Sequence, residues 1–262
     1  MNETDIEYLE MTWNPIAMRC IPISIGCAGC WHIAMANRLA GNLAFPKEVR
    51  AAYSGEGPPI LVESRLGEPL RRKKPTTIGV QFMGDLFHKD LSFELIGDIW
   101  QTMFETPQHT YLVLTKRPSR MKEFVEEYWM GAVDYHPDDS ILPNVWLGVT
   151  VENQKAADER IPILLETPAT VRFVSCEPLL GPIDFGELYH GLSWCIIGAE
   201  SGPNARGMNE DWVRSLILQC KSHAIPIFYK QQIINGKKIS MPLLGGRHYA
   251  EFPQIIGRLS AN

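Results

Sequence analysis

Short apolar, β-branched segments alternate with amphipathic segments along most of the chain from residue 76 onward. The apolar segments have the length and composition of buried strands, and the segments between them repeat apolar residues at helical spacing. The expected strands cover residues 77–82, 110–115, 144–151, 171–176, 194–198 and 226–229. The expected helices cover residues 93–104, 119–129, 154–165 and 210–222.

Before this alternation begins, residues 11–15 predict one more strand and residues 31–43 a helix. Residues 44–75 are rich in glycine, proline and charge, which indicates an irregular insertion. Alternating strands and helices are typical of a parallel sheet covered by helices. We therefore expect one α/β domain over residues 1–262, a full or partial parallel (β/α) barrel of about six to seven strands with a C-terminal extension at 232–262. A doubly wound open sheet is the alternative.

Composition narrows the function classes. The 262 residues are 45% hydrophobic, enough for a substantial core, and the net charge of −5 is unlike that of most nucleic-acid-binding proteins. No apolar segment approaches the ~18 residues of a membrane span, so no membrane partner is expected. The acidic N-terminus does not resemble a signal peptide. Clustered cysteines without such a signal favour the cytoplasm. Nucleic acid as a partner stays open.

Three cysteines lie close together between the first expected strand and the helix that follows it. Cys20, Cys27 and Cys30 have the spacing C-x6-C-x2-C. Three thiolates can hold a soft metal or a cluster, and they are one ligand short of a closed site. Such a site keeps an open metal position for chemistry. A zinc site completed by a histidine, such as His32 or His88, is the alternative.

A second group of candidate residues follows the ends of the expected strands. Parallel strands place their carboxyl ends on one side of the sheet, where the catalytic groups of barrels lie. These groups and the cysteine loop should therefore share one rim, with opposite charges as neighbours. A purely structural charge network is the alternative. The candidates are Asp85, Lys116, Glu152, Cys176, Glu177, Glu200 and Lys230.

Several motifs along the chain resemble a phage and bacterial family of three-cysteine proteins. Besides the cysteine loop, they are Thr12-Trp-Asn-Pro15, Leu114-Thr-Lys-Arg-Pro118, Asn144-Val-Trp-Leu-Gly148, Arg172-Phe-Val-Ser-Cys-Glu-Pro178, Gly198-Ala-Glu-Ser-Gly202 and Phe228-Tyr-Lys-Gln231. This group in turn resembles radical S-adenosylmethionine enzymes of the spore photoproduct lyase-like branch. The pairs Gly84-Asp85 and Thr115-Lys116 carry that second resemblance.

The resemblance implies a cofactor pair and a reaction type. Cys20, Cys27 and Cys30 would ligate three irons of a [4Fe–4S] cluster, and the fourth iron would take the amino and carboxylate groups of S-adenosylmethionine. Reduction by a donor such as flavodoxin or ferredoxin would then generate a 5′-deoxyadenosyl radical. The substrate is unknown, with a nucleotide or modified base as one candidate.

The resemblance also implies roles for the strand-end residues. Asp85, Lys116, Glu152, Glu200 and Lys230 would bind the cofactor. Lys116, Glu177 and Cys176 would act in catalysis. Cys176 would be a hydrogen-atom donor, with a packed core thiol as the alternative. The rival hypothesis is a non-catalytic zinc protein whose barrel rim binds a partner.

Overall fold

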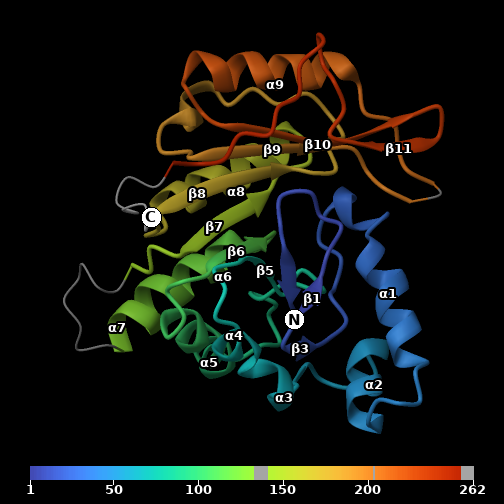
Figure 1. Cartoon of the computed structure of the whole chain (residues 1–262), viewed down its shortest axis with the longest axis vertical. Helices are drawn as coiled ribbons and strands as arrows, with labels where there is room; N and C mark the ends of the chain where they lie inside the picture. The colour runs from blue at the N-terminus through green and yellow to red at the C-terminus, as the bar shows by residue number, and fades with distance from the viewer. Residues whose placement is uncertain (133–140, 203, 255–262) are drawn as a thin grey trace.

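A nine-stranded sheet runs through the molecule in the order β1–β2–β5–β6–β7–β8–β9–β10–β11 (Figure 1). The computed structural model describes residues 1–132, 141–202 and 204–254. The strands are β1 (Asn2–Glu3), β2 (Met11–Trp13), β5 (Thr77–Val80), β6 (Thr110–Thr115), β7 (Val145–Thr150), β8 (Val171–Cys176), β9 (Trp194–Gly198), β10 (Ile227–Ile234) and β11 (Lys237–Ser240).

The sheet is mostly parallel, which confirms the predicted α/β class. All pairs from β2 to β10 are parallel, whereas β1 and β11 pair antiparallel at the two ends. Of the predicted full or partial barrel of about six to seven strands, the full barrel is wrong, because the sheet has nine strands and, among the described strands, β1 and β11 pair with no further neighbour. The doubly wound alternative is also wrong. Its strand order reverses at a switch point, whereas this order follows the sequence throughout.

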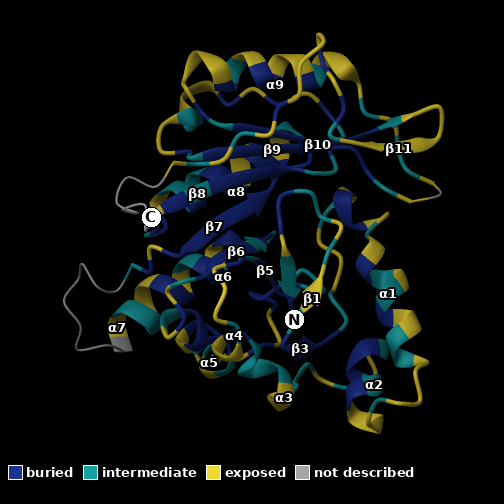
Figure 2. Cartoon of the chain, in the orientation of Figure 1, coloured by how far each residue is buried: buried dark blue, intermediate teal, exposed yellow. Residues whose placement is uncertain are grey.

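The helices between the strands pack on one face of the sheet. They are α5 (Phe93–Phe104), α6 (Pro118–Glu123), α8 (Gln154–Glu166) and α9 (Glu210–Ser222). Their apolar sides bury Ile99, Leu164 and Leu216 in one large core with strand residues such as Val113 and Val174. Figure 2 shows α9 with an exposed outer side above buried strands. Burial of this apolar surface is the main stabilising contribution to the fold.

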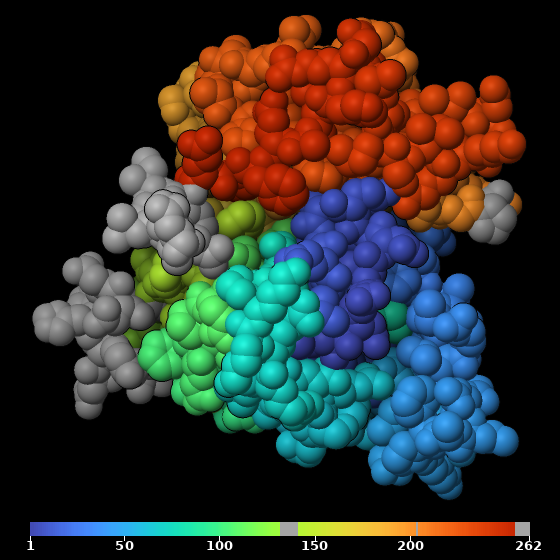
Figure 3. Space-filling model, in the orientation of Figure 1, coloured from blue at the N-terminus to red at the C-terminus, as the bar shows by residue number. Residues whose placement is uncertain are grey.

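The opposite face of the sheet is covered by its own aromatic side chains. Trp146, Phe173, Trp194 and Phe228 form a second core with Tyr8 of the N-terminal segment. Tyr8 contacts Trp194 edge to face at 5.7 Å between ring centroids. Large side chains thus fill the space that helices occupy on the other face. Figure 3 shows the N-terminal segment at the surface, between the C-terminal part of the chain and residues near 70.

The predicted strands and helices after residue 76 coincide with observed ones to within a few residues. Residues 119–129 form α6 and a π-helical segment, Phe124–Trp129, which continues into α7 (Met130–Ala132). The expected helix after the cysteines is α1 (Trp31–Ala40). No helix in the described part of the chain combines the length and apolarity needed to cross a membrane.

Two segments differ from the prediction. Residues 44–75 are not irregular, because they contain α2 (Lys47–Ser54), β4 (Ile60–Leu61), α3 (Glu63–Leu66) and α4 (Glu68–Arg71). Strand β4 pairs with β3 (Ile16–Ala17) in a small separate sheet. The supposed extension from residue 232 begins inside β10, which continues to Ile234 and turns into β11. Short amphipathic elements in a segment rich in glycine and proline give little periodicity to recognise.

Candidate functional site

The cysteine loop connects β3 to α1 at the carboxyl end of β2. Its backbone is held by a 3-10 turn at Ile25–Cys27, and the Cys30 amide donates to the carbonyl of Cys27 at 3.2 Å. The Cys20 amide donates to Nε2 of His32 at 3.0 Å, which fixes the start of the loop against α1. Cys30 is the residue immediately before α1. The three cysteines are therefore held by local hydrogen bonds and by the helix.

One cavity brings the loop cysteines together with the strand-end charges. Parallel strands end on the same side, so side chains that follow different strands meet there. Glu152 lies beneath this rim and contacts Lys116, while Cys176 does not line the cavity. The predicted residues that line the cavity are Cys20, Cys27, Cys30, Asp85, Lys116, Glu177, Glu200 and Lys230.

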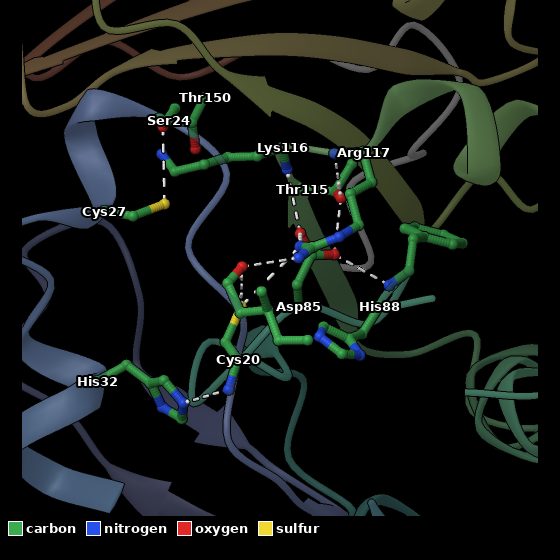
Figure 4. A network of polar contacts seen from close by, with 12 residues as sticks. Cys20, Ser24, Cys27, His32, Asp85, His88, Thr115, Lys116, Arg117 and Thr150 are labelled. Atoms are coloured by element: carbon green, nitrogen blue, oxygen red, sulfur yellow. Dashed lines mark hydrogen bonds and ion pairs between the residues drawn. The ribbon is translucent and has the colours of Figure 1, made fainter. Parts of the chain in front are cut away.

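Asp85 holds Arg117 beside the first cysteine. Its Oδ1 accepts from the Thr115 hydroxyl at 2.7 Å and from the Phe87 amide at 3.0 Å. Its Oδ2 accepts from the Lys116 amide at 3.2 Å and from the Arg117 guanidinium at 2.7 Å. The guanidinium lies 3.9 Å from Sγ of Cys20 (Figure 4). Asp85 has thus used its acceptor positions within the protein, and it orients a cation toward sulfur.

Glu152 holds Lys116, the second cation near the loop cysteines, as Asp85 holds Arg117. Lys116 Nζ is 2.8 Å from its Oε1, and Arg160 is 2.9 Å from its Oε2. The Ser24 hydroxyl of the cysteine loop also donates to this carboxylate. These cations outweigh the effect of burial and lower the pKa of Glu152. Figure 4 shows the Ser24 hydroxyl above the Cys27 sulfur, from which it lies 3.6 Å away.

Glycines allow the loop to approach two of the carboxylates closely. A Cβ at Gly26 would lie 2.5 Å from Oε1 of Glu152, and a Cβ at Gly29 would collide with Glu200. Glu200 itself accepts hydrogen bonds from the side chain and the amide of Arg206, at 2.8 Å from Nε and 2.9 Å from the amide. The two glycines of the C-x6-C-x2-C segment therefore place the thiols over the charged rim.

The last pair at the rim joins Glu177 to Lys230. Lys230 Nζ lies 2.5 Å from Oε1 of Glu177 and 5.8 Å from the centre of the Tyr8 ring. Lys230 is 8% exposed. Burying a charge costs free energy unless it is paired. All the rim charges meet that requirement, because opposite charges are neighbours in each pair.

The three loop thiols have different electrostatic surroundings. Burial raises the pKa of Cys20 to about 11, with the Asp85 charge acting in the same direction. Burial also raises the pKa of Cys30. Burial opposes ionisation of Cys27 too, but hydrogen bonds from the Ile23–Ser24 segment and the Lys116 charge together lower the pKa of Cys27. Cys27 is the thiol most readily converted to the metal-binding thiolate.

In each histidine proposed as a fourth zinc ligand, one ring nitrogen already accepts a hydrogen bond from a backbone amide. Nε2 of His32 accepts from the Cys20 amide, and Nδ1 of His88 accepts from the Asp90 amide at 3.3 Å. Their other nitrogens are buried without a hydrogen-bond partner. Burial lowers the pKa of both imidazoles, that of His32 to about 4. Among the described residues, no three His, Cys, Asp or Glu side chains are arranged to hold a single metal ion.

Cys176 has a different position from the one expected. It is fully buried in the core on the helix-facing side of the sheet. Side chains alternate along a strand, so Ser175 and Glu177 face the cavity and Cys176 faces away from it. Cys176 is therefore excluded as a hydrogen-atom donor in the cavity.

The expectations from sequence also missed residues of the site. Tyr8 lines the cavity, and Arg160 and Arg206 each neutralise a rim carboxylate. Tyr8 precedes the first parallel strand, and both arginines lie several residues past a strand end. The other site residues were predicted because they directly follow a strand, and this criterion does not identify Tyr8, Arg160 or Arg206.

The fold and this site define the class of protein: a mostly parallel α/β protein with a three-cysteine loop over a charged cavity at its strand ends. By sequence the chain belongs to the family described as Protein of unknown function (DUF5131), which matches residues 3–253. No curated protein and no solved structure matches the chain.

Proposed function

We propose that this protein is a radical S-adenosylmethionine-type iron–sulfur enzyme. The observation that carries the proposal is the shared cavity: all three loop thiols border it together with charged groups that follow β5, β6, β8 and β9 and with Lys230 inside β10. A structural metal site has no need of such a cavity. The sequential order of the parallel strands also suits a partial (β/α) barrel, the fold that the resemblance implies.

The donor set fits the proposed cofactors. Cysteine thiolates are the usual ligands of iron–sulfur clusters, and three of them leave one iron of a [4Fe–4S] cluster free for S-adenosylmethionine. When bound, this pair of cofactors supplies a 5′-deoxyadenosyl radical that removes a hydrogen atom from a substrate. The protein's contribution is to bind and orient the cofactors and to keep water out of the cavity.

The charged residues then have two kinds of role. Lys116 and Arg117 place positive charge beside Cys27 and Cys20, where it stabilises thiolate ligands. Among the described residues Lys116 has one ion-pair partner, Glu152, and it retains N–H groups for the carboxylate of S-adenosylmethionine. Asp85, Glu152 and Glu200 are engaged by protein donors, so we assign them to positioning and not to direct cofactor binding.

The proposal includes an electron donor and a compartment. One-electron reduction requires a donor such as flavodoxin or ferredoxin. Cysteines without disulfide partners in the loop suit a reducing cytoplasm, that of the bacterial host if the chain is phage-encoded.

The test is cleavage of S-adenosylmethionine by the reconstituted protein. With dithionite and without oxygen, the wild-type protein should form 5′-deoxyadenosine, and Cys195→Ala, a core substitution, should form it too. Cys30→Ala should form none. A colourless wild-type protein with one zinc per chain and no product would contradict the proposal and support the non-catalytic zinc alternative.

A further inference from the structure

The four carboxylates at the rim differ in how many hydrogen bonds the protein already gives them. Asp85 accepts from four donors, Glu152 from Lys116, Arg160 and Ser24, and Glu200 from three groups of Arg206. Within the described part of the chain, Glu177 accepts from Lys230 alone, on Oε1. No donor among the described residues reaches its Oε2, although the side chain is only 18% exposed. Glu177 is therefore the rim carboxylate with an oxygen, Oε2, that accepts from no described donor.

Lys230 has N–H donors without a described acceptor next to Oε2 of Glu177. An ammonium group carries three N–H donors, and the only described oxygen bonded to Nζ of Lys230 is Oε1 of Glu177. Its other close neighbour is the face of the Tyr8 ring. The pair thus offers one acceptor and further donors side by side, and both residues line the cavity.

The pair lies where the cavity meets a second hollow. A groove of about 680 Å³ lies beside α1 and the N-terminal segment and shares Glu177 and Lys230 with the cavity. Its volume is within the range of small-molecule sites. A ligand in the groove can therefore reach the Glu177–Lys230 pair and the cysteine cavity together.

Aromatic side chains flank this junction. Trp31 and Phe82 line both hollows, and Trp31 is 46% exposed although it is a large apolar side chain. Met35, one turn after Trp31 on α1, continues the apolar wall of the groove. Exposed aromatic rings beside a few polar groups are typical of sites that bind flat ligands.

We propose that Glu177 and Lys230 form a recognition site for the cyclic amide edge of a flat heterocycle. The ring N–H donates to Oε2 of Glu177, the adjacent C=O accepts from Nζ of Lys230, and the ring packs against Trp31 and Phe82. A cyclic amide presents its donor and acceptor side by side, as the pair requires. Calling this ligand the substrate rests on the proposed function, whereas the binding itself does not.

The experiment compares two small probes with the reconstituted protein. 2-Pyridone has the amide edge, and N-methyl-2-pyridone keeps the ring and the carbonyl but lacks the N–H. NMR titration should give a dissociation constant for 2-pyridone at least about tenfold lower than for the methylated probe. Equal affinity for the two probes, or no binding of 2-pyridone, would overturn the proposal. This comparison needs no substitution and is independent of how variants fold.

Substitutions of the two residues test whether 2-pyridone binds at the Glu177–Lys230 pair. Glu177→Ala and Lys230→Met should each weaken 2-pyridone binding about tenfold or more, whereas Lys122→Met, which removes an exposed ion pair with Glu166, should leave it unchanged. Unchanged binding in both cavity variants would place the ligand elsewhere and overturn the assignment. Displacement of 2-pyridone by S-adenosylmethionine, with both variants losing the cofactor, would also overturn it, because the pair would then belong to the cofactor.

The outcome is separable from that of the proposed function. The 2-pyridone titration measures binding alone, and the 5′-deoxyadenosine assay measures cofactor cleavage alone. Formation of 5′-deoxyadenosine without 2-pyridone binding would refute this site alone. Binding without 5′-deoxyadenosine would leave the site in place and refute the radical chemistry.

Discussion

The chain carries two groups of three cysteines with opposite surroundings. Cys20, Cys27 and Cys30 border a cavity, next to Lys116 and Arg117. The others lie fully buried between β8, β9 and α9, and they are Cys176, Cys195 and Cys220. Thiol neighbours and burial raise the pKa of both Cys195 and Cys220. Thiols that border a cavity beside cations are suited to bind metal, whereas thiols packed in the core serve as small core residues.

The largest expected difference between the two groups is in alkylation rate. In the native, metal-free protein, iodoacetamide should modify the loop cysteines, which border the cavity, and the lowered pKa of Cys27 favours its reactive thiolate. The core cysteines should react at least about 1000-fold more slowly, since they become accessible only on unfolding. Mass spectrometry of time points gives both rates. Modification of Cys176 as fast as Cys27 would remove the distinction.

A second prediction concerns the support of the loop cations. Asp85→Asn leaves the Arg117 guanidinium, 13% exposed, without its carboxylate partner. Removing one member of a buried pair typically costs about 3 kcal/mol or more in the free energy of unfolding. Lys122→Ala, which breaks a comparably close but exposed pair, should change it by less than about 0.5 kcal/mol. Urea denaturation measures both, and equal effects would show that Asp85 is not structurally engaged.

A third prediction concerns the close approach of the loop to the rim. Gly26→Ala places a methyl group 2.5 Å from Oε1 of Glu152, a side chain already held by Lys116 and Arg160. Overpacking of this kind costs about 1–3 kcal/mol, and we expect the displaced loop to expose Cys27 to faster alkylation. The matched control is Gly207→Ala, where no atom lies within 4 Å of the added Cβ. Identical stability and alkylation in the two variants would contradict the docked loop.

Much of this arrangement could be predicted from the sequence, because it depends on local pattern. The spacing of apolar residues and the β-branched composition predicted the strands from β5 to β10. Parallel strands place their carboxyl ends together, which predicted the shared rim. The alternation of side chains along β8 could also have been used to predict which residues face the cavity. Residues 175 and 177 must face one side and residue 176 the other, so Cys176 and Glu177 could not both line the cavity.

Other features depended on contacts that no local pattern contains. The open edges of the sheet, the pairing of β1 and β11 at its ends and the packing of Tyr8 against Trp194 join segments distant in the chain. Arg206 reaches Glu200 from a loop, where charged residues are usually solvated. Long-range packing of this kind leaves no periodic signal in the sequence.

The central claim is that the loop cysteines, and not the core cysteines, hold a cluster. Its most direct test is the iron and sulfide content of anaerobically reconstituted wild-type, Cys30→Ala and Cys195→Ala proteins. The account predicts about four irons per chain in the wild-type protein and in Cys195→Ala, and a loss of the cluster in Cys30→Ala. Full iron content in Cys30→Ala, or zinc in place of iron in the wild-type protein, would contradict it.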